Sequence, residues 1–173
     1  MNIWLNRAMW AAIEVFRAYF EPRRSARRTL SRTDSEGKAF ALILAGCLVL
    51  FCAQIPDLVR MSATAGDDLP FAGLATATIF GAVLLAPLVF YAAAGISGLI
   101  ARFVGRSISW LHARVSLFWA VFAVSPAVLL AALLLEFSGD YAAFALVHWI
   151  LLALFLMFWV SGLIESANAG KIE

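Results

Sequence analysis

The chain has 173 residues, enough for a single domain, and its formal net charge at pH 7 is +2. It is 64% hydrophobic and 14% charged, whereas a soluble domain is typically about 45–50% apolar and about 25% charged. The apolar residues occur in long uncharged runs that exceed what a small water-soluble core can bury, so the composition excludes an ordinary soluble protein.

The first predicted element is an amphipathic helix over residues 3–20. Apolar side chains at three- and four-residue spacing share one face of it, and Arg7 and Glu14 lie on the other side. We expect this helix to lie flat on the cytoplasmic leaflet, although packing against the protein's own loops or a partner is the alternative. Pro22 is expected to end it. The apolar face comprises Leu5, Met9, Ile13, Phe16 and Phe20.

A basic segment completes the predicted cytoplasmic region, residues 1–38. Eight of the thirteen Lys and Arg residues precede residue 39, and the densest stretch holds Arg23, Arg24, Arg27 and Arg28. A basic stretch beside a membrane span is more typical of binding to anionic phospholipids than to nucleic acid, so we expect lipid and no nucleic-acid partner. Thr33 and Glu36 have the spacing of a capping box, which predicts a helix start near Asp34.

Residues 39–164 are predicted to form a four-helix transmembrane domain, followed by a cytoplasmic tail over 165–173. Pro56 and Asp57 are expected to end the first span. The second lies within 31 uncharged residues, 71–101, which as one helix would measure about 46 Å, so we expect it to tilt or to bend at Pro87. The predicted fold is therefore all-α and polytopic, with an N-terminal interfacial helix and spans at about 39–54, 74–101, 115–135 and 142–164.

The distribution of positive charge predicts the orientation. With four spans, twelve Lys and Arg residues fall on one side and only Arg60 falls on the other. The positive-inside rule then places both termini in the cytoplasm, and we expect a multi-pass protein of the bacterial inner membrane. The loop between the second and third spans adds Arg102 and Arg106 to the predicted lipid- or partner-contacting residues.

The spans contain little that indicates catalysis. Their interiors hold no Asp, Glu, Lys or Arg, and His148 is the one titratable exception. A lone histidine is more typical of a hydrogen bond to a neighbouring helix than of a proton or metal site, although Glu136 could pair with it. Cys47 and Cys52 lie about 140° apart around a helix, which suits neither a disulfide nor a metal pair. We therefore expect no metal, no cofactor and no enzymatic activity.

Small residues recur at four-residue spacing in the second span. Such faces allow helices to approach closely in lipid, either within the fold or between chains. The predicted packing residues are Gly73, Ala77, Gly81, Ala94 and Gly98.

Three features together resemble the Yip family of small multi-span membrane proteins. They are the proline-arginine segment 21–28, a short cytoplasmic loop with Gly105 and the run 109–111, and the step Ser125-Pro126 in the third span. The family usually has five spans, whereas four are found here. The resemblance implies a non-enzymatic role in membrane organisation or trafficking.

The leading functional hypothesis is a non-catalytic inner-membrane scaffold or accessory subunit that binds lipid, a larger membrane complex or a second copy of itself. The alternative is a small transporter or channel component, either as a single chain or as an oligomer. A third possibility, an enzyme acting on lipids at the cytoplasmic interface, would depend on His112 and the arginines. The polar side chains available for a transport path are Thr76, Thr78, Ser97, Ser125 and His148.

Overall fold

The computed structural model describes residues 13–65, 70–103, 109–138 and 141–169, without the side chains of 101–103, 137–138, 141–144 and 169. All described elements are helical, which confirms the predicted all-α fold. Residues 13–20 form the described part of the N-terminal helix. The elements that follow are α2 (Pro22–Arg32), α3 (Glu36–Ala65), α4 (Phe71–Phe80), the π-helical turn η2 (Gly81–Leu85), α5 (Ala86–Phe103), α6 (Trp110–Ser138) and α7 (Tyr141–Ala169).

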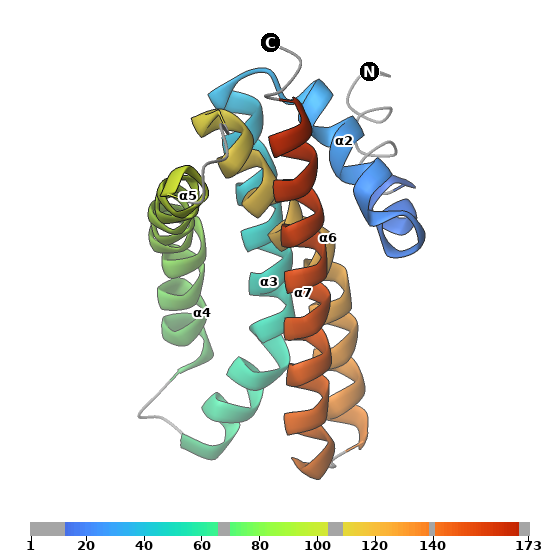
Figure 1. The fold of residues 1–173 in the computed structure, drawn as a ribbon. Helices are drawn as coiled ribbons and strands as arrows, with labels where there is room; N and C mark the ends of the chain where they lie inside the picture. Colours follow the sequence, from blue (N-terminus) through green and yellow to red (C-terminus); the bar gives the residue numbers. More distant parts are fainter. Residues whose placement is uncertain (1–12, 66–69, 104–108, 139–140, 170–173) are drawn as a thin grey trace, which may run out of the picture.

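Four stretches within these helices are long and apolar enough to cross a membrane, as predicted. They cover Glu36–Ala65, Phe71–Ile100, Trp110–Glu136 and Ala145–Asn168, and each exceeds the roughly 20 residues that a bilayer requires. The chain is therefore a multi-pass membrane protein. Figure 1 shows α3, α6 and α7 side by side, the α4–α5 helix to one side, and α2 packed across one end.

Helix α6 forms the centre of the bundle. Of its most apolar stretch 44% is buried, against 17% for the α4–α5 helix and for α7. The largest fully buried side chains are Trp119 and Phe118 on α6, Phe158 on α7 and Ile43 on α3. All four lie in the half of the bundle that α2 covers, so the tight core is concentrated near that end.

Helix α3 begins close to its predicted start near Asp34, but the predicted end at Pro56 is wrong. The helix begins at Glu36, and Thr33 is the C-cap of α2, where its N–H donates to the Thr29 carbonyl. At the other end α3 continues through Pro56 to Ala65. A proline inside a membrane helix removes one backbone hydrogen bond without ending the helix, and α3 bends in its last turns (Figure 1).

The expected bend in the second span lies at η2, just before Pro87. The π-helical turn Gly81–Leu85 joins α4 to α5 without a break in the chain of helical residues. A π-turn inserts an extra residue into the helix and changes its direction. In Figure 1 the α4–α5 helix turns strongly at this level.

Two polar segments that the sequence analysis left outside the helices are helical. The basic segment after Pro22 forms α2. Pro22 lies in its first turn, where a backbone N–H would have no acceptor within the helix, so proline costs no hydrogen bond there. Helix α7 continues beyond Ile164 to Ala169, so Glu165 and Ser166 belong to it and are buried.

Candidate functional site

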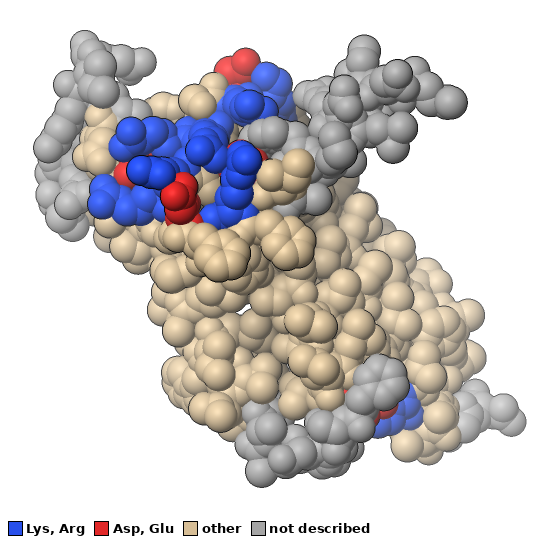
Figure 2. Space-filling view, turned by 90° about the vertical axis from the view of Figure 1, so that its right-hand side faces the viewer, with Lys and Arg blue, Asp and Glu red and all other residues tan. Residues whose placement is uncertain are grey.

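Positive charge gathers at the end of the molecule that α2 covers, called here the arginine-rich end. Figure 2 shows a band of Lys and Arg over this end, a body with no charged residues in view, and a small charged patch at the opposite end. The described cations of the arginine-rich end outnumber its carboxylates by eight to five. The cations are Arg17, Arg23, Arg24, Arg27, Arg28, Arg32, Lys38 and Arg114, and the carboxylates are those of Glu14, Glu21, Asp34, Glu36 and Glu165.

Helix α2 has two distinct faces. Ser25, Ala26, Thr29 and Leu30 are buried, and their one-turn spacing places them on the same side. Because three of these four side chains are small, α2 can pack closely on α6 and α7. The four arginines of residues 23–28 fall on the remaining surface, where the guanidinium groups stay in contact with solvent or head groups.

Two of these arginines bind a buried carboxylate of α7. The Nε atoms of Arg23 and Arg27 lie 3.1 Å and 2.8 Å from the two oxygens of Glu165. Since the arginines are one turn apart, their side chains converge on one acceptor. The arginine side chains remain 59% and 72% exposed, so the contact ties α2 to α7 and still leaves positive charge at the surface.

A second buried carboxylate, Glu14, ties the N-terminal helix to α2. Its Oε1 atom lies 3.3 Å from Nη1 of Arg28 and 3.5 Å from Nη1 of Arg17. The Ser25 hydroxyl lies within 3.1 Å of both Oε2 and the backbone carbonyl of Glu14. A buried carboxylate needs such partners, because an unpaired one costs several kcal/mol. Glu14 lies on the predicted polar face of the N-terminal helix, and its side chain is turned inward.

The N-terminal helix consequently presents apolar side chains outward. Ile13 is partly exposed, and Phe16 and Phe20 are 76% and 85% exposed. Tyr19 points inward and donates a hydrogen bond of 3.0 Å from its hydroxyl to the Ala123 carbonyl on α6. An outward apolar face beside a row of arginines is the arrangement expected of a helix at a lipid head-group boundary. Leu5, Arg7 and Met9 lie outside the described residues.

The other predicted lipid-contacting residues belong to the loop after α5. The backbone of Arg102 lies within α5, and its side chain, like Arg106 as a whole, is outside the described part. Arg114, at the start of α6, pairs with Glu36 of α3 and lies 5.7 Å from the ring centroid of Tyr91. These contacts join α3, α5 and α6 at the arginine-rich end.

The predicted packing residues occupy two different environments. Ala94 is fully buried, and a Cβ atom added at Gly98 would lie 3.3 Å from the Trp110 ring. Ala77 and Gly73 are exposed, and Gly81 has no neighbouring atom within 4 Å of its would-be Cβ. Among the described residues, Gly73 and Gly81 therefore make no close helix contact.

Two glycines outside the predicted packing residues also lie where two helices approach closely. A Cβ atom at Gly46 would lie 3.3 Å from the Phe122 backbone, and one at Gly162 would lie 2.9 Å from Cβ of Ser116. The hydroxyls of Ser116 and Ser166 are 2.7 Å apart beside this second contact. Spacing alone could not find Gly46, because residues 42 and 50 are both Leu. Gly162 has Ser166 four residues later, so the small-residue spacing could have identified it.

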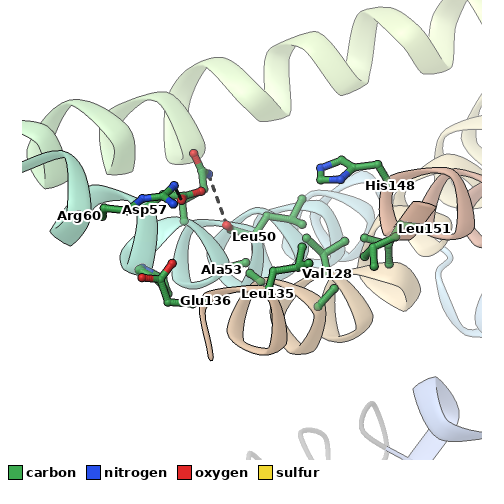
Figure 3. Close-up of a pocket in the computed structure, with 14 residues that line it drawn as sticks. Leu50, Ala53, Asp57, Arg60, Val128, Leu135, Glu136, His148 and Leu151 are labelled. Carbon is green, nitrogen blue, oxygen red and sulfur yellow. Dashed lines mark hydrogen bonds and ion pairs between the residues drawn. The ribbon is translucent and has the colours of Figure 1, made fainter. Parts of the chain in front are cut away.

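A cavity of about 420 Å³ lies at the opposite end, between α3, α6 and α7. Figure 3 shows Asp57, Arg60 and Glu136 near one end of it and His148 at the other. Arg60 forms an ion pair with Asp57. Glu136 and His148, which the sequence suggested as a possible pair, both line this cavity. No cluster of three or more metal-ligating side chains occurs within the described residues.

The hydroxyls considered for a transport path bond mainly to their own helices. Thr76 and Ser97 each donate a 2.7 Å hydrogen bond to the carbonyl four residues earlier. Ser125 donates a 2.9 Å bond to the Phe122 carbonyl, which Pro126 leaves without its usual N–H donor. Thr78 is half-buried on α4. The bonded hydroxyls thus donate to carbonyls of their own helices. None of these four residues lines the cavity of Figure 3.

Comparison of the chain with protein-family models, with curated proteins and with solved structures finds no match in any of the three.

Proposed function

We propose that the chain is a non-catalytic scaffold or accessory subunit of a bacterial inner membrane, with the arginine-rich end on the cytoplasmic side and bound to anionic phospholipids. One observation carries this proposal: the arginines of α2 are exposed beside the outward phenylalanines of the N-terminal helix. The first group suits anionic head groups, and the second suits the upper part of the acyl chains.

The ion pairs explain how this surface is held in place. Glu14 and Glu165 fix the N-terminal helix and α2 against the bundle, while the arginines that bind them remain partly exposed. The excess of positive charge at this end agrees with the cytoplasmic side under the positive-inside rule. The resemblance to the Yip family implies the same kind of non-enzymatic role in membrane organisation. A larger membrane complex, or self-association, is the further partner that we propose for the scaffold.

The test compares anionic and zwitterionic lipid on matched variants. Arg24 is 74% exposed and pairs only with the exposed Glu21 among the described residues, so Arg24→Gln is not expected to unfold the protein. One arginine near an anionic surface contributes about 1 kcal/mol, which corresponds to about a fivefold weaker interaction with phosphatidylglycerol. Arg60→Gln makes the same chemical change at the opposite end and serves as the control.

Native mass spectrometry of the detergent-purified chain measures the phosphatidylglycerol adducts of both variants. We expect Arg24→Gln to bind phosphatidylglycerol about fivefold more weakly than the unchanged chain and Arg60→Gln to bind it as strongly as the unchanged chain. Equal binding of phosphatidylglycerol and phosphatidylcholine by the unchanged chain, or equal effects of the two variants, would show that the arginine-rich end is not a lipid site.

A transporter or channel component is the second candidate, and the cavity lined by His148 is the observation in its favour. The hydroxyls of Thr76, Ser97 and Ser125 argue against a continuous polar path, because they bond to their own helix backbones. Flux through proteoliposomes that His148→Ala abolishes would make this candidate the better one.

A further inference from the structure

The cavity at the opposite end is not used by the proposed lipid surface. It is bounded by three helices that cross the membrane, and most of its inner wall is apolar, with Leu50 and Ala53 on α3, Val128 and Leu135 on α6, and Leu151 on α7. Gln54 and His148 are the uncharged polar side chains among the residues that line it. Its charged residues are Asp57, Arg60 and Glu136, which belong to the last turns of α3 and α6. The cavity thus has a charged rim and a mostly apolar interior, with His148 at the end away from the rim (Figure 3).

The depth of the cavity suits part of an acyl chain. Leu50 and Arg60 are ten residues apart on one helix, which corresponds to about 15 Å along its axis. A volume of about 420 Å³ is within the range of pockets that bind small organic ligands. Because the three helices cross the membrane, the apolar molecules that can reach the cavity from its surroundings are lipids.

The charges of the rim select the head group. Asp57 is bonded to Arg60, and Glu136 is exposed beside them. Two carboxylates against one guanidinium leave an excess of one negative charge, which disfavours an anionic lipid. A head group that carries both an ammonium and a phosphate matches both signs, with the ammonium at Glu136 and the phosphate at Arg60.

We propose that this cavity binds one phospholipid of the leaflet opposite the arginine-rich end, with an ethanolamine head group at the rim and an acyl chain between α3, α6 and α7. The primary ammonium of ethanolamine donates hydrogen bonds to Glu136, which the trimethylated ammonium of choline cannot do. The affinity of the cavity is therefore highest for phosphatidylethanolamine, lower for phosphatidylcholine and lowest for phosphatidylglycerol.

Two variants test the cavity itself. Ala132 lines it, so Ala132→Phe fills it, whereas Leu130 is 58% exposed on the same helix and outside the cavity. Native mass spectrometry with three lipids of identical acyl chains is expected to show a phosphatidylethanolamine adduct in the unchanged chain and in Leu130→Phe, and its loss in Ala132→Phe. An adduct that persists in a folded Ala132→Phe protein would overturn the proposal.

The head-group assignment is tested by Glu136→Gln, which retains the size of an exposed side chain and is not expected to affect folding. The preference for phosphatidylethanolamine over phosphatidylglycerol should fall about fivefold, the size expected for one exposed ion pair. An unchanged preference would contradict the assignment. The same variant leaves phosphatidylglycerol binding at the arginine-rich end intact, and Arg24→Gln leaves phosphatidylethanolamine binding intact, so the two lipid proposals fail separately.

Discussion

The contact between α6 and α7 at Gly162 provides the sharpest test of the packing. In Gly162→Ala the added methyl group would lie 2.9 Å from Cβ and 3.2 Å from Cα of Ser116. Because the second of these atoms is backbone, a rotamer change cannot relieve the overlap, and the two helices must move apart. The same movement would lengthen the 2.7 Å hydrogen bond between Ser116 and Ser166.

The expected magnitude combines two opposing contributions. Overpacking one extra methyl group typically costs about 1–3 kcal/mol, while alanine is about 1 kcal/mol more favourable than glycine in a helix interior. Gly95 is the matched control, because it lies within α5 and a Cβ atom there meets nothing within 4 Å. Gly95→Ala therefore receives only the helix-propensity gain, and the two variants should differ by about 1–3 kcal/mol.

Thermal unfolding of both variants in one detergent, followed by circular dichroism, measures this difference. For a chain of this length about 1 kcal/mol shifts Tm by roughly 2–4 °C. We expect Gly162→Ala to unfold at least about 2 °C below Gly95→Ala. If the two variants unfold at the same temperature, α6 and α7 do not approach each other as closely as the structure indicates.

Two further predictions concern single hydrogen bonds. Ser125→Ala should destabilise the protein by about 1 kcal/mol in thermal unfolding, because the Phe122 carbonyl loses its donor; in a Pro126→Ala background, where a backbone N–H is restored, the loss should be smaller, and an equal loss would refute the reasoning. The hydrogen bond from Lys38 lowers the pKa of the Asp34 carboxyl below 3.8. The interaction with Lys38 therefore contributes a small stabilisation above the ordinary pKa of the carboxyl, and this stabilisation is lost as the pH falls through the lowered pKa. Lys38→Gln should raise the pKa of Asp34 measured by NMR. An unchanged value would contradict the interaction.

The number and type of the membrane helices could be predicted from the sequence because apolar length alone determines them. Their ends could not, because local signals compete with tertiary contacts. Pro56 normally signals a helix end, yet in a membrane the backbone has no water to bond with, and the helix continues past it. Glu36 had the spacing of a capping residue, but its carboxylate binds Arg114 of α6.

The candidate sites were accessible from the sequence only in part. The arginines of residues 23–28 could be selected because charge beside a membrane span is informative by itself. Their partner Glu165 was assigned to a polar tail, since nothing in the local sequence shows that α2 folds back onto α7. The cavity could not be foreseen either, because it depends on how side chains of three helices, including His148, meet in space.

Labelling of single cysteines tests the orientation of the four-span protein most directly. In a background with Cys47→Ala and Cys52→Ala, the variant Ser31→Cys places a thiol at the arginine-rich end and Ala63→Cys places one at the opposite end, both at exposed positions. With a membrane-impermeant maleimide on intact spheroplasts, we expect Ala63→Cys to be labelled at once and Ser31→Cys only after permeabilisation. Labelling of Ser31→Cys in intact cells would contradict a cytoplasmic arginine-rich end.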